Sequence, residues 1–335
     1  MTTKQITKFP RWRRSMAVGC ALAVLALACS TMARAQAQAF PSKPIKLISG
    51  ASAGSASDVI ARAVAEKLQA EFGVVVVIDN KAGAAGTLAA QSTLAAPPDG
   101  HTIFVYTGAH TVLPLISKVA YDPIRDFSAV IPLALVPNVM VVSTAKGYKT
   151  VKDVVDAAKA KPGQLNYASV GVGSATYMSA EKFRIATGID AVHVPYKGSP
   201  EAITETIAGR VDYFFAPLVS ALPLIKSGKL QALAVSTPKR SAQLPDVPTI
   251  AEAGVAKADY VFWIGMLVSS KTPRDIVQKL SQSTARALQS AEVRDRLASL
   301  GAEPMPMSPE QFDALIKDEM TANAIIVKAA GIKPE

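Results

Sequence analysis

Three times in this sequence, an apolar, strand-like run leads into a loop of Gly, Ala and Ser and then into a helical pattern. These junctions span Ile45 to Asp58, Val74 to Thr87 and Leu165 to Thr176. Such a junction leaves backbone N–H groups unpaired and directs the positive end of a helix dipole at one point, which favours an anion. The repeated junction therefore predicts a strand-and-helix chain with a site for a small anionic molecule.

The N-terminal residues have the pattern of an export signal. Five basic residues within positions 4–14 precede an uncharged apolar run at 16–29, and Ala33-Arg34-Ala35 has the small-residue form of a cleavage site. The apolar run is shorter than the roughly 20 residues that span a bilayer. We therefore expect a cleaved signal peptide over residues 1–35 rather than a membrane anchor.

Several details of export stay open. Cleavage after Ala37 or Ala39 competes with cleavage after Ala35. Arg13-Arg14 is compatible with twin-arginine export, and Cys29 is a candidate for lipidation. Each alternative still places the protein outside the cytoplasmic membrane, so we expect a periplasmic location.

Removal of residues 1–35 changes the composition of the exported chain. It takes away six basic residues and no acidic ones, so the formal net charge falls from +10 to +4. Such a weak positive charge gives little support to a nucleic-acid partner. Cys20 and Cys29 leave with the same segment, so the exported protein would have neither a disulfide nor a thiolate metal site.

Strand-like runs alternate with helical patterns along the rest of the chain, which indicates an α/β fold. Runs that are apolar throughout, such as Thr102 to Thr107, suit a parallel sheet covered on both faces. A first set of units ends at a strand predicted near Leu133 to Ser143, and a second set begins at the helix that Thr150 opens. Without a long linker, we expect the backbone to cross between two lobes more than once and to leave a cleft at the crossing. The expected division is residues 36–140 with 260–335 in lobe 1, and residues 141–259 in lobe 2.

A catalytic interpretation of the first junction must be considered. Gly50-Ala51-Ser52-Ala53-Gly54 matches the G-x-S-x-G nucleophile elbow between a strand and a helix. The alternative function is therefore an exported serine hydrolase with Ser52 as nucleophile and His193 as base. However, this elbow would lie on the first strand of the exported chain, with nothing upstream to supply the usual oxyanion loop. We expect the protein not to be an enzyme.

The sequence gives no support for a cofactor or a metal ion. His101, His110 and His193 lack the spacing of known metal sites. No phosphate loop with Gly-Lys-Ser or Gly-Lys-Thr is present, and the glycines of Gly83–Gly86 and Gly171–Gly173 are too few for a dinucleotide fingerprint. We expect neither a cofactor nor a metal.

The small-residue loops offer the groups that a carboxylate needs. Hydroxyl and N–H groups can hold a carboxylate through charge-assisted hydrogen bonds. Asp58 would act through water or a ligand amine or hydroxyl, or else close a capping box that starts at Ser55. Ser169 and Ser174 either face the first loop across the cleft or cap a helix. Two further residues each have two interpretations. Tyr177 either contacts the ligand or packs in the core. Lys197 either contacts the ligand or is an ordinary solvated lysine.

Short segments along the chain together resemble one family. The chain is similar to the periplasmic solute-binding proteins of tripartite tricarboxylate transporters, the Bug-type receptors, over nearly all of its length after the signal. The matching segments are Phe40–Ile45, Gly54–Asp58 with Ala61-Arg62, Asn80 through Gly83 to Gly86, Pro98-Asp99-Gly100, Tyr167-Ala168-Ser169 with Gly171 and Gly173-Ser174, His193–Gly198, and Pro245–Thr249 with Glu252-Ala253-Gly254.

The resemblance implies a two-lobed periplasmic-binding-protein fold, type II-like, with the ligand cleft between the lobes. It also implies capture of a small carboxylate, either a di- or tricarboxylate or an aromatic one, for the membrane permease subunits of a transporter. Carried over to this sequence, the ligand-binding residues are Ser52, Gly54, Ser55, Asp58, Gly83, Ala84, Ser169 and Ser174, to which the residue pattern adds Tyr177.

Two departures from the family pattern fall where the ligand would sit. The usual Gly-Gly before the family's Asp is Gly54-Ser55 here, and a common His in the helix after the third loop is Tyr177. We therefore expect a carboxylate that is unusual for the family, aromatic ones included. An effector-sensing domain of a transcription regulator shares the fold class, but the export signal and the lack of a DNA-binding module oppose it.

Overall fold

The structure is a computed structural model of the 335-residue chain, and it describes residues 40–329. The expected signal peptide lies outside the described residues. Contacts divide the chain into two compact units, residues 1–42 and 43–335, and all described helices and strands belong to the second unit. No helix within the described part is both long enough and apolar enough to cross a membrane.

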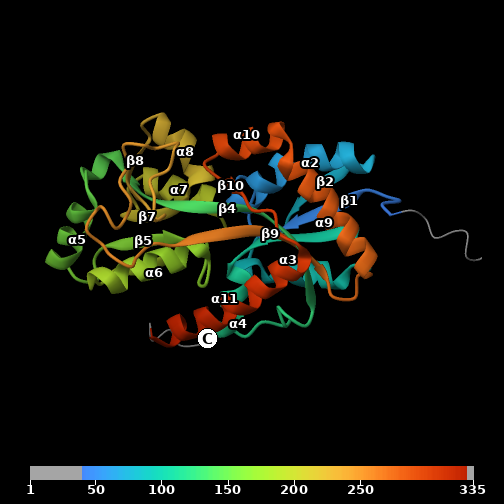
Figure 1. The fold of residues 1–335 in the computed structure, drawn as a ribbon. Helices are drawn as coiled ribbons and strands as arrows, with labels where there is room; N and C mark the ends of the chain where they lie inside the picture. The colour runs from blue at the N-terminus through green and yellow to red at the C-terminus, as the bar shows by residue number, and fades with distance from the viewer. Residues whose placement is uncertain (1–39, 330–335) are drawn as a thin grey trace, which may run out of the picture. The chain divides into compact units, whose positions relative to one another are not determined.

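Strands and helices alternate along the second unit, so the expected α/β class is confirmed (Figure 1). The strands are β1 (Ile45–Ser49), β2 (Val76–Asn80), β3 (Thr102–Thr107), β4 (Phe127–Ser143), β5 (Asn166–Ser169), β6 (Val192–Pro195), β7 (Tyr213–Pro217), β8 (Leu230–Val235), β9 (Val261–Ser269) and β10 (Glu303–Pro304). The α-helices are α2 (Ala56–Phe72), α3 (Thr87–Ala95), α4 (Ala109–Ile116), α5 (Val151–Ala160), α6 (Ala175–Thr187), α7 (Ser199–Ile207), α8 (Leu218–Lys226), α9 (Arg274–Gln289), α10 (Ala291–Ser299) and α11 (Pro309–Ala329). Short 3₁₀ turns lie at η1 (Ala84–Gly86) and η2 (Thr144–Lys146).

The strands pair in the order β2-β1-β3-β9-β4-β7-β5-β6, and β8 and β10 also pair with β4. β1 is parallel to β2 and β3, and β5 is parallel to β6 and β7. β9, however, is antiparallel to both β3 and β4. The prediction of a parallel sheet is thus correct only within each set of βα units, because an apolar run reports burial of both faces and leaves the strand direction open.

β4 belongs to two parts of the sheet. Its first part pairs with β9, and its second part pairs with β7 and β8. We call the part around β1, β2, β3 and β9 lobe 1, and the part around β5 to β8 lobe 2. The long strands β4 and β9 lie side by side where the lobes join (Figure 1).

β4 starts at Phe127, ahead of the predicted Leu133. The sequence hides this earlier start because Pro132 has no N–H group to donate to a neighbouring strand. The pairing with β9 shifts register twice in this region, once beside Pro132. Such irregularities let a strand continue through a proline.

The core of lobe 2 lies on both faces of its sheet. Tyr213 and Phe215 of β7 belong to one buried cluster with Phe183 of α6. Phe214, between them in sequence, belongs to a second cluster with Leu222 of α8. Successive strand residues point to opposite faces, so one strand supplies both clusters.

Two helices, α4 and α8, have no counterpart in the sequence-based prediction. Each begins directly after a strand and contains an interior proline, Pro114 in α4 and Pro223 in α8. An interior proline removes a backbone donor and usually ends a helix, so the pattern does not reveal these two. α4 forms part of the cleft wall, as the lining residues Ala109 and Leu113 show.

Candidate functional site

A cavity of about 500 Å³ is lined by residues of both lobes, and all three small-residue junctions reach it. The first junction contributes Gly50, Ala51 and Ser57; the second contributes residues 83–87; the third contributes residues 170–172 and Ser174. The remaining lining residues are Tyr106, Thr107, Ala109, Leu113, residues 117–119 and residues 195–197. Junctions that are far apart in the sequence therefore converge on one hollow.

The second junction has an unusual backbone. Gly83, Ala84, Ala85 and Gly86 have φ angles of +124°, +45°, +47° and +87°. A left-handed conformation costs an alanine about 1 to 2 kcal/mol, and such strain gathers at functional sites. The N–H groups of Ala84 and Ala85 donate to no acceptor among the described residues. Neighbouring unpaired N–H groups in a turn form a concave site that suits an anion.

Tyr106 of β3 supports this strained turn. Its hydroxyl donates to the carbonyl oxygen of Ala85. Its ring lies so close to Gly50 and Gly86 that an added Cβ would be 2.7 Å and 2.4 Å from it. Burial raises the pKa of the Tyr106 hydroxyl far above its ordinary range, so this group stays a hydrogen-bond donor. Only glycine therefore fits at positions 50 and 86 beside the Tyr106 ring. The ring in turn supports the strained turn that lines the cavity.

The third junction is held by side chains behind the cavity surface. The Ser174 hydroxyl accepts a hydrogen bond from the Tyr177 N–H at 3.2 Å and caps α6. Ser169 is fully buried, with Oγ 2.6 Å from Nε2 of His193 and 3.0 Å from the Gly171 N–H that donates to it. The Tyr177 ring meets the His193 ring edge-on at 4.9 Å. Burial lowers the pKa of His193, which favours a neutral ring beside Ser169.

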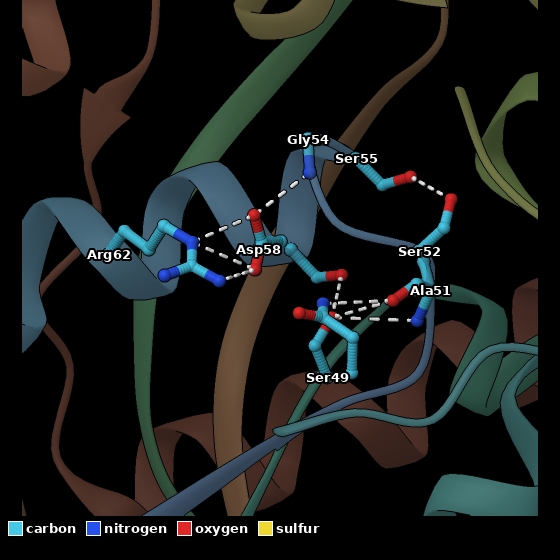
Figure 2. Close-up of polar contacts among 9 residues, drawn as sticks. Ser49, Ala51, Ser52, Gly54, Ser55, Asp58 and Arg62 are labelled. Carbon is cyan, nitrogen blue, oxygen red and sulfur yellow. Dashed lines mark hydrogen bonds and ion pairs between the residues drawn. The ribbon is translucent and has the colours of Figure 1, made fainter. Parts of the chain in front are cut away.

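Asp58, in the first turn of α2, is held by neighbours in its own lobe. Its carboxylate accepts from the Gly54 N–H at 2.9 Å and from Nε of Arg62 at 3.0 and 3.1 Å (Figure 2). Burial opposes ionisation, but hydrogen bonds from Arg62, Gly54 and Asn80 outweigh it and lower the pKa of Asp58. The Ser55 hydroxyl makes no hydrogen bond to its own helix, so the capping box that would join it to Asp58 does not form.

Instead, the first loop contacts lobe 2. The Ser55 hydroxyl accepts from the Ser199 N–H at 3.0 Å. The Ser52 hydroxyl donates to Oε2 of Glu201 at 3.0 Å, and the Ser220 hydroxyl donates to the Gly54 carbonyl oxygen at 3.0 Å. Figure 2 shows the Ser52 and Ser55 hydroxyls pointing toward each other. These contacts join the lobes beside the cavity.

Of the nine predicted ligand-binding residues, three line the cavity, namely Gly83, Ala84 and Ser174. The structure places the other six behind or beside the cavity wall, where their side chains or backbones hold the first and third loops: Ser52, Gly54, Ser55, Asp58, Ser169 and Tyr177. Their assignment to the ligand stays a prediction.

The arrangement of side chains does not provide the hydrolase constellation. Ser52 pairs with Glu201 and Ser55, whereas His193 pairs with Ser169. A histidine base must reach the nucleophile's hydroxyl to activate it. Ser52 therefore lacks the predicted His193 base in this arrangement. Within residues 40–329, no group of three or more His, Cys, Asp or Glu side chains could hold a metal ion.

Sequence reasoning missed the contribution of β3 and of the segment after α4. Thr107-Gly108-Ala109 joins β3 to α4 through small residues, so it is a fourth junction of the same kind. The sequence contains this small-residue pattern, but Pro114 obscures the helix that follows it. Lys118 gave no signal, because only the folded chain brings this exposed residue to the cavity.

Comparison with known proteins agrees with this geometry. A family described as "Tripartite tricarboxylate transporter family receptor" matches residues 60–332. A protein encoded in the tcbD-tcbE intergenic region of Pseudomonas sp. strain P51 is 35% identical over 302 residues, which cover 89% of this chain and 90% of the relative.

Two solved structures share the fold at similar identity. A protein of R. palustris solved with adipate is 32% identical with a TM-score of 0.85, and the match covers 88% of this chain and 100% of that one. The periplasmic binding protein BugD is 28% identical with a TM-score of 0.85, again over 88% and 100% of the two chains. The resemblance to Bug-type receptors and the two-lobed fold are thus confirmed. These neighbours are solute-binding proteins, not enzymes.

Proposed function

The chain belongs to the family of tripartite tricarboxylate transporter receptors, and on this premise we propose that it captures a small carboxylate outside the cytoplasmic membrane for the permease subunits of such a transporter. The expected signal peptide over residues 1–35 and a periplasmic location belong to the same proposal. A receptor of this kind releases its ligand chemically unaltered.

The convergence of the three junctions on one cavity is the observation that carries this proposal. The unpaired N–H groups of Ala84 and Ala85 offer charge-assisted hydrogen bonds to a carboxylate, each worth about 1.5 to 3 kcal/mol. No Asp or Glu is among the described residues that line the cavity, so no carboxylate of its lining repels an anion. Adipate, with which the R. palustris relative was solved, is a carboxylate of suitable class.

The nine predicted site residues take two roles in this proposal. Gly83, Ala84 and Ser174 contact the carboxylate directly, because they line the cavity. The remaining six shape the loops that surround it or reach the ligand through water. Asp58 in particular orders the first loop through the Gly54 N–H.

Closure of the lobes would present a loaded receptor to the permease. The proposed lobe boundaries, near residues 140 and 260, lie within β4 and just before β9. β4 pairs with strands of both lobes, so we propose that dihedral changes in these two segments move one lobe against the other. This supports a cleft that opens and closes at the crossing.

Thermal-shift and calorimetric screening tests the proposal. The panel should hold aliphatic di- and tricarboxylates and aromatic carboxylates, each beside its uncharged amide. A true ligand at about 100 times its dissociation constant adds about 2.7 kcal/mol to the free energy of unfolding, and its amide adds nothing comparable. Stabilisation by no carboxylate, or by the amides equally, would contradict the proposed function.

A further inference from the structure

Two lysines reach the cavity from opposite lobes. Lys118 follows α4 in lobe 1, and Lys197 lies between β6 and α7 in lobe 2. Both residues line the same cavity of about 500 Å³, and both are exposed. A lysine carries its ammonium group on a long, flexible stem, so either group can reach a ligand bound in this cavity.

Neither lysine has a carboxylate partner. Among the described residues, no Asp or Glu oxygen lies within 4.0 Å of the Lys118 or Lys197 ammonium. Several other lysines do have such a partner, for example Lys146 with Asp212 and Lys46 with Asp79. The described lining residues include no Asp or Glu, and the nearest carboxylate to the Lys197 backbone that the structure shows is that of Glu201, whose Oε2 lies beside Gly198 and accepts from Ser52.

The contact between the lobes fixes where Lys197 stands. Lys197 directly precedes Gly198, where an added Cβ would lie 1.9 Å from the Ser52 hydroxyl and 2.6 Å from the Ser55 hydroxyl. Ser52 and Ser55 belong to lobe 1, so the backbone at Lys197 is held against the other lobe. Because Lys118 and Lys197 belong to opposite lobes, closure over a ligand would bring both positive charges toward it, and charges interact more strongly there than in open water.

We propose that Lys118 and Lys197 select the charge of the ligand, so that the receptor prefers a dianion to a monoanion of the same length. This inference rests on the proposed function, because it concerns the carboxylate bound in the same cavity. The N–H groups of Ala84 and Ala85 accommodate one carboxylate without any side-chain charge. A second anionic group would neutralise the lysines, whereas an apolar end would leave them uncompensated on closure.

Part of the cavity lining is apolar. Leu113, Val119, Val170 and Val172 contribute apolar surface to the lining, beside its charged and polar residues. An extended dianion with an apolar spacer satisfies both features. A highly hydroxylated dianion would lose hydrogen bonds to water against these side chains.

Isothermal titration calorimetry with adipate and hexanoate tests the inference, because these acids have the same carbon chain and differ by one carboxylate. The variants are Lys118→Met and Lys197→Met, which remove the charge but keep the length. Lys118→Arg keeps the charge. Lys229→Met is the matched control, because Lys229 is exposed, has no carboxylate partner among the described residues and does not line the cavity.

We expect the wild type to bind adipate more tightly than hexanoate. Each cavity Lys→Met change should weaken adipate binding about tenfold with little effect on hexanoate, while Lys118→Arg and Lys229→Met stay close to wild type. Circular dichroism and melting temperature show that each variant is folded.

Equal affinity of the wild type for the two acids would overturn charge selection while leaving the carboxylate-receptor function in place. Equal weakening of both acids in the Met variants would overturn it too. Loss of adipate affinity in Lys229→Met would attribute the preference to net charge rather than to the two cavity lysines. Binding of neither acid would also contradict this inference, and the wider carboxylate panel then decides the proposed function separately.

Discussion

The Ser55 hydroxyl accepts a hydrogen bond from the Ser199 N–H at 3.0 Å, so the N-cap residue of α2 in lobe 1 caps α7 in lobe 2. Ser55 gives no such bond to its own helix. The N-cap residue of α7 is Gly198, which has no side chain with which to cap it. A helix end in one lobe is thus completed by a residue of the other lobe.

We expect Ser55→Ala to loosen lobe closure. Loss of an N-cap costs about 1 kcal/mol, and here the loss falls on the closed arrangement. Adipate affinity should fall, and small-angle scattering with adipate should show a larger radius of gyration than for the wild type. Ser290→Ala is the control, because Ser290 caps α10 within one lobe at 3.4 Å. An equal loss of affinity in both variants would contradict a role in closure.

Gly198→Ala should impair closure more strongly than Ser55→Ala. The added methyl group would lie 1.9 Å from the Ser52 hydroxyl, and overpacking of this kind costs about 1 to 3 kcal/mol. The backbone of Gly198 itself is extended and accepts an alanine. Calorimetry with adipate measures the loss. Addition of Ser52→Ala removes the nearest atom, so the double variant should regain part of the affinity; no recovery would show that the contact with Ser52 is not the cause.

The sequence predicts much of the frame that carries the site. The strands Ile45–Ser49 and Thr102–Thr107 are correct to the residue, because short apolar runs between turn residues leave few alternatives. The convergence of the junctions also follows from the α/β pattern. α4 and α8 escape detection because Pro114 and Pro223 break the helical pattern.

The partners of individual side chains were beyond sequence reasoning. Ser55 and Ser199 are 144 positions apart, and Ser52 and Glu201 are 149 positions apart. Local chemistry predicts that a serine before a helix caps that same helix. Only the packing of the two lobes decides that Ser55 caps α7 instead.

Ala85→Gly should raise the free energy of unfolding and lower the affinity for the ligand. Glycine tolerates the +47° φ angle, so the free energy of unfolding should rise by about 1 kcal/mol. A more mobile turn holds its N–H groups less firmly, so adipate affinity should fall. Lys257→Gly provides the control, because Lys257 also has positive φ, +62°, and does not line the cavity. Denaturant unfolding and calorimetry check both quantities; unchanged affinity in Ala85→Gly would show that strain at this turn is not used in binding.

His110 should make the protein less stable as the pH falls. Burial lowers its pKa to about 4 from an ordinary 6.5, although a hydrogen bond to the Pro123 carbonyl oxygen and the charge of Asp122 oppose this shift. Between these values the unfolded chain binds the proton and the folded chain does not, so the free energy of unfolding falls with pH. The loss between pH 8 and pH 5 is about 2 kcal/mol.

His110→Gln keeps a donor for the Pro123 carbonyl oxygen and removes the titrating ring. Urea unfolding of both proteins at several pH values should give a shallower pH dependence for the variant. All other titrating groups are shared, so the difference between the two curves reports His110. Parallel curves would contradict the assignment.

A crystal structure with the tightest-binding carboxylate of the panel tests the central claim most directly. The account predicts a carboxylate group within hydrogen-bond distance of the Ala84 and Ala85 N–H groups, in the cavity where the three junctions meet. A carboxylate bound elsewhere, with these N–H groups facing an uncharged part of the ligand, would contradict it.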